Sequence, residues 1–218
     1  MQIMREQLYP DNNNTAYPFV RSVNIGGQLT NRLYIVIHFT AGQSAAAAVE
    51  WLATKASQVS AHLVIGRKGE ITQLVPFNVI AWHAGQSSWG GHKFLNSYSI
   101  GIELDNAGKM TRINNQWVAA FKKIYPDNEV LLATHKFDTK PAGWHIFTPE
   151  QIHATIDICR VLVKTYGIKE ILGHDDIAPK RKWDPGPAFP MDDIRAQVFT
   201  PAPPPPRESP EPPPVTTV

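Results

Sequence analysis

The segment Leu33–His38, LYIVIH, is an uninterrupted run of apolar, mostly β-branched residues that ends in a histidine. Such a run predicts a strand buried on both faces, which is typical of the centre of a parallel sheet covered by helices. This constrains the fold class more than any other feature, because both faces of the strand need covering elements. The 218 residues, 43% of them hydrophobic, are enough for one domain of this kind.

Further segments have the periodicity or the capping residues of regular elements. They are a helix over 44–54 with Ser44 as its cap, a hairpin formed by 61–67 and 70–75, a strand over 99–105, a helix over 149–166, and a last strand and short helix over 170–173 and 192–199. The long helix has a predicted capping box at Thr148 and Gln151, Pro149 at its first position and Gly167 after its last. The sequence therefore predicts an α/β fold, a single domain with a mixed central β-sheet flanked by helices.

Composition and charge exclude several classes of protein. The net charge is +2, the pI is about 8.6, and lysine and arginine form no tract, which argues against a nucleic-acid partner. The one cysteine, Cys159, excludes an intrachain disulfide and a multi-cysteine zinc site, and its place on an apolar helical stripe predicts a core position. No stretch approaches the roughly 18 consecutive apolar residues of a membrane span.

The two ends of the chain differ in character from its middle. The first residues lack the apolar region of a standard signal peptide, so we expect synthesis in the cytoplasm. Residues 201–218 hold nine of the nineteen prolines and predict an extended or disordered linker, with a docking peptide for a proline-binding module as the alternative. We expect an N-terminal arm at 1–16, the catalytic domain at 17–199 and a proline-rich tail at 200–218.

Two of the eight histidines stand where predicted strands end. His38 closes the apolar strand, and His174 opens the loop GHDDIAPKRKWDPGP after strand 170–173. The ends of strands present side chains from a rigid base. With Asp184, these histidines could supply the three ligands of a catalytic zinc site that keeps one position open. Spacing alone leaves open that both are hydrogen-bonded structural histidines.

The other histidines have simpler interpretations. His92, His135 and His145 lie in segments that resemble loops, where we expect surface positions. His153 lies among the polar positions of the long helix and is expected to face water.

Five stretches occur in the order in which a known family has them. They are IVIHFTAG at 35–42, VSAHLVIGRKGEITQLVP at 59–76, AWHAG at 81–85, NSYSIGIEL at 96–104 and ILGHDDIAPKRKWDPGPAFP at 171–190. On these motifs the chain resembles the zinc-dependent N-acetylmuramoyl-L-alanine amidases of the type 2 amidase family, which includes bacteriophage amidases, cell-wall-recycling amidases and peptidoglycan recognition proteins. Residues 106–147 match least, and the resemblance implies nothing about them.

The resemblance assigns roles to five residues of the site. It places the Zn²⁺ ligands at His38, His174 and Asp184, the catalytic acid at Glu103 and the catalytic lysine at Lys182. Zinc and Glu103 would activate a water molecule, and Lys182 would stabilise the oxyanion of the intermediate. The structural alternatives are an edge-strand charge facing water for Glu103 and a solvated loop lysine for Lys182.

Four neighbouring residues are less clearly assigned. The AWHAG stretch implies that His83 contacts the substrate. Phe39 stands where many family members have a histidine or asparagine, so the contact made there is not carried over. Asp175 and Asp176 would either accept a hydrogen bond from a ligand imidazole or cap the turn.

The resemblance implies hydrolysis of the amide between N-acetylmuramic acid and L-alanine in peptidoglycan or muropeptides. The alternative is a non-catalytic module that binds the same ligands. The expected setting is cytoplasmic recycling of muropeptides, or release to the cell wall as a phage-type lysin.

Overall fold

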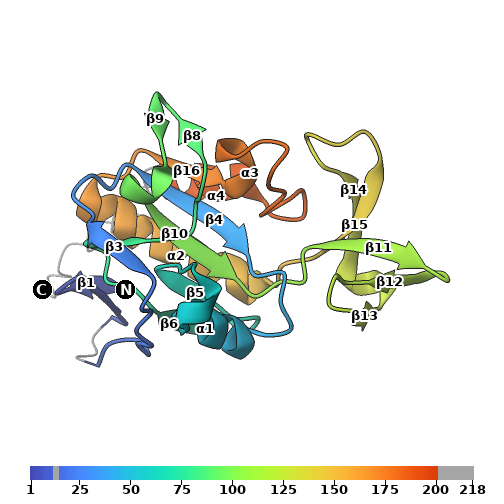
Figure 1. The fold of residues 1–218 in the computed structure, drawn as a ribbon, viewed down its shortest axis with the longest axis horizontal. Coiled ribbons are helices and arrows are strands. Elements are labelled where there is room, and N and C mark those ends of the chain that lie inside the picture. Colours follow the sequence, from blue (N-terminus) through green and yellow to red (C-terminus); the bar gives the residue numbers. More distant parts are fainter. Residues whose placement is uncertain (12–14, 201–218) are drawn as a thin grey trace, which may run out of the picture.

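The centre of the fold is a five-stranded mixed sheet with the strand order β16-β4-β10-β5-β6 (Figure 1). The computed structural model of the chain describes residues 1–11 and 15–200. The sheet strands are β4 (Tyr34–Phe39), β5 (Leu63–Ile65), β6 (Ile71–Gln73), β10 (Ser99–Leu104) and β16 (Glu170–Gly173). The first four strands in this order run parallel, and β6 is antiparallel to β5, which confirms the predicted mixed sheet.

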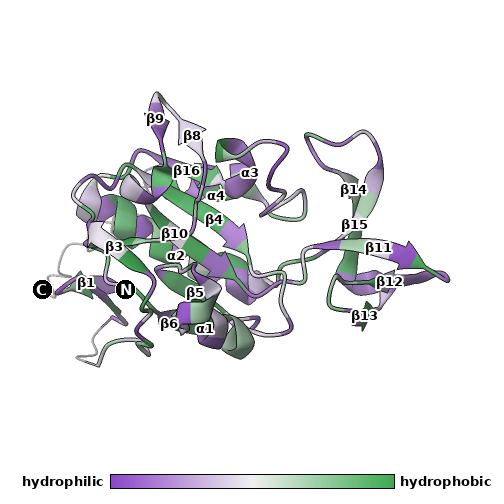
Figure 2. Ribbon diagram, in the orientation of Figure 1, coloured by the Kyte–Doolittle hydropathy of each residue, from purple (hydrophilic) through white to green (hydrophobic). Residues whose placement is uncertain are grey.

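Strand β4 is buried on both faces, as its sequence predicts. Ile35 and Ile37 join the main core cluster together with apolar residues of helix α2, whereas Val36 joins a second cluster with Leu172 and Ile177. Figure 2 shows the apolar character along β4 and β10. His38, the residue before the last of β4, therefore places a polar side chain at an otherwise apolar centre.

Three of the four helices in the described residues begin and end close to the predicted residues, whereas the short helix at His174–Ile177 lies where a loop was predicted. The helices are α1 (Ala45–Ala53), α2 (Pro149–Tyr166), α3 (His174–Ile177) and α4 (Met191–Phe199). Ser44 caps α1, and the capping box of Thr148 and Gln151 begins α2. Gly167 ends α2 with φ of +66°, a conformation that glycine adopts at little cost. Cys159 is fully buried in the main core, as predicted.

A second sheet lies to one side of the central sheet and was not predicted (Figure 1). Residues 107–147, which we call the β-extension, contain β11 (Lys109–Ile113), β12 (Gln116–Val118), β13 (Ile124–Tyr125), β14 (Val130–Thr134) and β15 (Pro141–His145). These strands form an antiparallel sheet in the order β13-β12-β11-β15-β14. The β-extension has a small core of its own around Met110, Trp117 and Tyr125.

Two-stranded antiparallel sheets complete the described fold. They are β1 (Gln2–Met4) with β2 (Gln7–Tyr9), β3 (Ile25–Gln28) with β7 (Val79–Ala81), and β8 (Ser88–Trp89) with β9 (His92–Lys93), beside 3-10 turns at Lys55–Ser57, Leu95–Ser97 and Asp127–Glu129. Leu8, in the predicted N-terminal arm, is fully buried in the main core and its N–H donates to Gln73. The predicted tail, apart from Thr200, lies outside the described residues. None of the helices in the described part is both long and apolar enough to cross a bilayer.

The prediction that His135 and His145 lie at the surface is wrong. They are 2% and 5% exposed, because both belong to the β-extension, whose sheet buries them. His92 is half-buried, and its ring lies 4.3 Å from that of Tyr98. His153 is exposed, as predicted.

His62 is a structural histidine that bridges two segments of the core. The Gly101 N–H donates to His62 Nδ1 at 3.0 Å, so Nε2 carries the hydrogen and donates to the Val79 carbonyl at 3.0 Å. Burial lowers the pKa of His62 to about 4. A proton added at Nδ1 would face the Gly101 N–H, so the folded state requires the neutral ring.

Acid should therefore destabilise the fold through His62. Because its folded pKa is about 4 and its unfolded pKa is about 6.5, the unfolded chain binds more protons between these values, and stability falls as the pH drops through this window. Between pH 7 and 4.5 the loss is about 2–3 kcal/mol from this group. Urea unfolding of metal-free protein at both pH values should show a smaller loss for His62→Asn, which keeps an acceptor for Gly101. An equal loss in both proteins would contradict this assignment.

Candidate metal centre and active site

Three side-chain atoms from distant parts of the chain meet at one point beyond the ends of β4 and β16. His38 Nδ1, His174 Nδ1 and Asp184 Oδ2 lie 2.9 Å from one another in all three pairs. His38 is on β4, His174 follows the adjacent parallel strand β16, and Asp184 lies on the loop after α3. All three residues are buried and could hold a metal ion.

No arrangement of protons satisfies this triangle. If both imidazoles donate to Asp184, two N–H groups face each other across 2.9 Å; if one nitrogen is unprotonated, its lone pair faces another lone pair or the carboxylate. A cation among the three atoms satisfies every one of them, since two imidazole nitrogens and a carboxylate oxygen are the usual donor set of a three-ligand zinc site. The residues present therefore fit a divalent metal ion.

The outward nitrogens of both histidines are fixed by hydrogen bonds that leave Nδ1 free to bind a metal. His38 Nε2 lies 3.0 Å from His83 Nδ1, and His83 Nε2 lies 3.4 Å from the carbonyl of Ser99. His174 Nε2 lies 3.2 Å from the carbonyl of Ala84. Since carbonyls only accept, the hydrogens sit on His83 Nε2, His38 Nε2 and His174 Nε2, the tautomers that metal-ligating Nδ1 atoms require.

Burial and the neighbouring charges prepare the ligands chemically. Burial, with repulsion from His174, lowers the pKa of His38 to about 4, so the ring is neutral at physiological pH. Burial by itself would raise the pKa of Asp184, but the close approach of the His174 and His38 rings outweighs burial and holds that pKa below its usual range. Neutral imidazoles and an ionised carboxylate are the states in which these groups bind metals.

Glu103 lies beside the cluster, on the central strand β10 and opposite His38 in the register with β4. The alternative of an edge-strand charge facing water is therefore wrong. Its Oε2 atom is buried and has no hydrogen-bond partner among the described residues. Burial, with repulsion from Asp184, raises the pKa of Glu103 to about 8, opposed by Lys182. A half-buried carboxyl beside a cavity, with one unpartnered oxygen and a shifted pKa, is typical of an acid–base catalyst.

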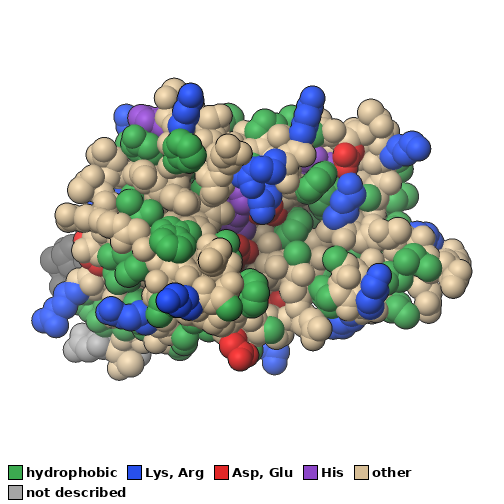
Figure 3. Space-filling model, viewed as in Figure 1, with side chains coloured by type: hydrophobic (Ala, Val, Ile, Leu, Met, Phe, Trp, Pro, Cys, Tyr) green, Lys and Arg blue, Asp and Glu red, His purple; other side chains and the backbone are tan. Residues whose placement is uncertain are grey.

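Two cavities flank the cluster. One, of about 310 Å³, is lined by His83, His174, Arg181 and Lys182, and the other, of about 280 Å³, by Trp51 and Glu103 with small residues of 40–48. Figure 3 shows histidine and acidic side chains at the bottom of a hollow near the centre of this face, with basic side chains beside it. The cluster therefore lies where an extended molecule could cross it.

Comparison with known proteins agrees with this geometry. Residues 29–187 match the family described as N-acetylmuramoyl-L-alanine amidase (Amidase_2). The chain belongs to this family. It is 35% identical over 173 residues to the N-acetylmuramoyl-L-alanine amidase AmiD of Escherichia coli (strain K12), covering 75% of this chain and 52% of AmiD. It is also 35% identical over 134 residues to the 1,6-anhydro-N-acetylmuramyl-L-alanine amidase AmpD of that strain, covering 61% of this chain and 54% of AmpD.

Solved structures of amidases confirm the fold. A crystal structure of an AmpD selenomethionine derivative has a TM-score of 0.59 at 27% identity, covering 84% of this chain and 94% of AmpD. AmiD from E. coli in complex with the substrate anhydro-N-acetylmuramic acid-L-Ala-D-gamma-Glu-L-Lys has a TM-score of 0.58 at 32% identity, covering 85% of this chain and 60% of AmiD. The chain spans about half the length of the curated relatives it matches.

Within this site, the structure gives His83 a contact that sequence reasoning did not predict. Its Nδ1 atom accepts a hydrogen bond from His38 Nε2. Its ring occupies the space above Gly101, where a Cβ would lie 2.7 Å from ring atoms. The His83 ring therefore fills the space that a side chain at Gly101 would occupy. The alternation of residues 99–105 alone suggests that nothing covers this face of the strand. Its predicted contact with substrate stays a prediction, and the ring also lines the 310 Å³ cavity.

The structure assigns contacts to three other residues near the ligands: Asp176 takes one of its two predicted roles, Asp175 takes neither, and Phe39 had no predicted role. Asp176 caps the turn by accepting the Gly173 N–H at 2.8 Å. Asp175 contacts His135 of the β-extension at 2.9 Å rather than a ligand imidazole. The Phe39 ring covers Gly108, at the root of the β-extension, where a Cβ would lie 2.6 Å from it.

Substitution of His83 should separate its two possible roles. His83→Phe removes the acceptor for His38 and should weaken zinc binding to metal-free protein by roughly 10- to 100-fold, the usual effect of losing a group that orients a ligand. His83→Asn keeps an acceptor in place of Nδ1 and should retain most of the affinity. Zinc titration against a competing indicator measures both. Unchanged zinc affinity with a raised KM in His83→Phe would instead support the substrate contact.

Proposed function

We propose that this chain is a zinc-dependent hydrolase that cleaves the amide between N-acetylmuramic acid and L-alanine. The observation that carries the proposal is the buried triangle of His38, His174 and Asp184 beside the unpartnered carboxyl of Glu103. Two imidazoles and one carboxylate are a donor set of catalytic zinc, which keeps a fourth position for water or substrate. Membership of the amidase family supports the bond that is cut.

Glu103 is proposed as the group that moves protons. An amide has a weakly electrophilic carbonyl and a poor leaving group, and a zinc ion held by the three ligands would polarise that carbonyl and lower the pKa of the attacking water. Glu103 accepts the water proton and passes it to the departing nitrogen of L-alanine. A cation beside Glu103 favours its ionised form, because opposite charge lowers the pKa of an acid. Its missing hydrogen-bond partner leaves the oxygen free for this transfer.

Lys182 is proposed to stabilise the negative charge that develops on the carbonyl oxygen. The backbone N–H of Lys182 donates to the Ala178 carbonyl at 3.1 Å. Lys182 is half-buried and lies two positions before Asp184. It lines the same cavity as His174. A positive charge in a partly enclosed site contributes more to catalysis than the same charge in water. This argues against the alternative of a solvated loop lysine.

The substrate is proposed to be a soluble anhydro-muropeptide. The cavity with Arg181 and Lys182 is basic and suits the carboxylates of a stem peptide. AmpD carries the name of a 1,6-anhydro-N-acetylmuramyl-L-alanine amidase, and AmiD has been solved with an anhydro-N-acetylmuramic acid tripeptide. Both facts support a recycling role over the alternative of a lysin that acts on intact cell wall.

A non-catalytic binding module is the rival function. Such a module needs neither a complete ligand set nor a carboxyl beside it. Here all three ligand positions and Glu103 are suited to catalysis, and the burial of the unpartnered Glu103 Oε2 atom costs stability that binding alone does not require. The residues therefore support an enzyme.

Removal of the metal should abolish hydrolysis. We expect purified protein to release free amino groups from anhydro-N-acetylmuramyl-peptide, to lose this activity in chelator and to regain it with zinc. Intact sacculi, assayed in parallel, should be cut more slowly. Full activity of metal-free protein would overturn the zinc proposal, binding without amine release would favour the module, and faster cleavage of sacculi would favour the lysin.

Glu103→Gln should lower kcat by about 10²- to 10⁴-fold, because the amide cannot accept the water proton. Zinc affinity should change little, since Glu103 is not among the three ligand atoms. Glu50→Gln is the matched control on the exposed face of α1 and should keep normal turnover. Turnover in Glu103→Gln equal to that of Glu50→Gln would remove Glu103 from the mechanism.

A further inference from the structure

The segment that carries two of the three ligands, His174 and Asp184, is joined by a backbone hydrogen bond close to both of them. The Asp175 N–H donates to the Asp184 carbonyl at 2.8 Å, which ties the residue after His174 to the third ligand. Gly173 has no space for a Cβ, because the carboxylate of Asp175 folds over it and Pro185 Cδ lies 2.8 Å from the Cβ position. Asp175 is therefore the residue through which the two ligand-bearing ends of the loop meet.

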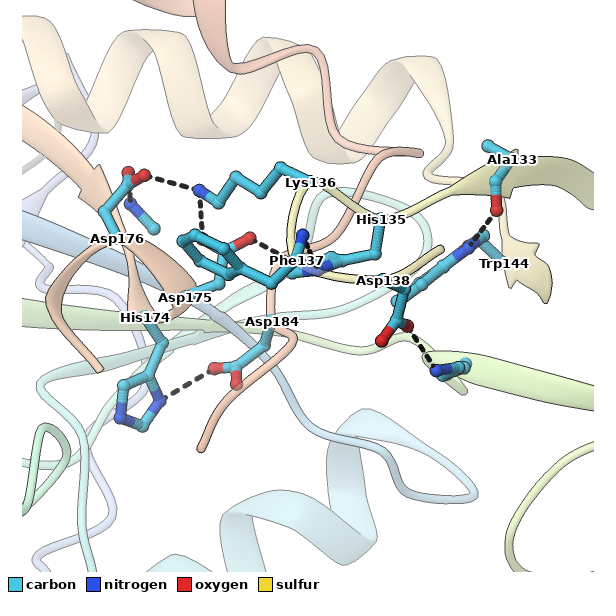
Figure 4. Close-up of polar contacts among 12 residues, drawn as sticks. Ala133, His135, Lys136, Phe137, Asp138, Trp144, His174, Asp175, Asp176 and Asp184 are labelled. Atoms are coloured by element: carbon cyan, nitrogen blue, oxygen red, sulfur yellow. Dashed lines mark hydrogen bonds and ion pairs between the residues drawn. The ribbon is translucent and has the colours of Figure 1, made fainter. Parts of the chain in front are cut away.

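The β-extension reaches this residue with two side chains that follow strand β14 (Figure 4). His135 Nε2 lies 2.9 Å from Asp175 Oδ2, and the two side chains are 1% and 6% exposed. Lys136 Nζ lies 3.0 Å from Asp175 Oδ1 and also pairs with Asp176. A buried carboxylate without such partners would be costly, so Asp175 depends on the β-extension for its position.

The His135 ring is itself oriented for this contact. The Phe137 N–H donates to Nδ1 at 3.2 Å, so Nε2 carries the hydrogen and donates to Asp175. The His135 ring stacks on the Trp144 ring, with 5.5 Å between the ring centroids and an interplanar angle of 25°. The Trp144 indole donates to the Ala133 carbonyl at 3.0 Å, which fixes the stack within the sheet of the β-extension.

The same tryptophan also contacts the other end of the ligand loop. A Cβ at Gly186 would lie 2.7 Å from the Trp144 ring, so the loop after Asp184 rests directly on that ring. Lys109 Nζ lies 5.7 Å from the Trp144 ring centre and 5.6 Å from that of Trp183, which precedes Asp184. The β-extension thus contacts the loop on both sides of its ligands.

We propose that the β-extension sets the metal affinity of the site, with His135 as a positioning residue that holds His174 and Asp184 through Asp175. The inference rests on the proposed metal site. His135 touches neither the metal ligands nor the proposed catalytic groups in any described contact. Its effect must therefore pass through the Asp175 carboxylate and the hydrogen bond from the Asp175 N–H to Asp184.

The test compares zinc binding of four proteins without substrate. His135→Asn keeps the acceptor for Phe137 but cannot reach Asp175, and should raise the zinc Kd roughly ten-fold and speed zinc release to excess chelator. His135→Gln restores a donor near the position of Nε2 and should recover most of the affinity. His145→Asn changes a buried histidine of the same sheet that does not contact the loop, and should leave the Kd within two-fold. The melting temperature of each metal-free protein is measured in parallel.

Each outcome bears on a different claim. Zinc affinity of His135→Asn equal to that of the wild type, or the same loss in His145→Asn, would overturn this inference while leaving the proposed function intact. Failure of the wild-type protein to bind zinc would overturn both. If His135→Asn does not fold, Lys136→Met is the second test: its partly exposed side chain can be replaced at small cost, and several-fold faster zinc release supports the inference, whereas wild-type release contradicts it.

Discussion

The convergence of two imidazole nitrogens and one carboxylate oxygen at 2.9 Å is the interaction on which the rest of the site depends. Three such atoms cannot all be satisfied by protons, so the arrangement is stable chiefly when a cation joins them. The fold brings them together because β4 and β16 are adjacent and parallel, and each is followed by a histidine or ends near one. The carboxylate comes from a loop that returns to the same end of the sheet.

Glycines leave the space that the residues supporting the ligands occupy. Gly101 leaves room on the central strand for the His83 ring, and that ring orients His38 through its second nitrogen. Gly173 and Gly186 likewise leave room for Asp175 and Trp144. These glycines act by close approach of neighbouring groups, so a methyl group at any of them would displace a residue that supports the site.

The β-extension lies outside the family motifs, yet it contacts the loop that carries two of the proposed ligands. It has its own small core, and it contacts the central domain where the ligand loop lies. If its contacts govern metal affinity, the proposed catalytic function would depend on a sheet that contributes no ligand. The basic cavity and the unpartnered Glu103 carboxyl remain features of the central domain alone.

The sequence by itself determined the central strand, the capped helix α2, the mixed sheet and the three residues proposed as metal ligands, because periodicity, capping and motif residues are local signals. It did not determine the β-extension, the burial of His135 and His145, or the partner of His83. Those depend on which segments meet in space: His38 and His174 are 136 positions apart, and His135 and Asp175 are 40 apart. Contacts at such separations follow from strand register and packing, which only the tertiary structure fixes.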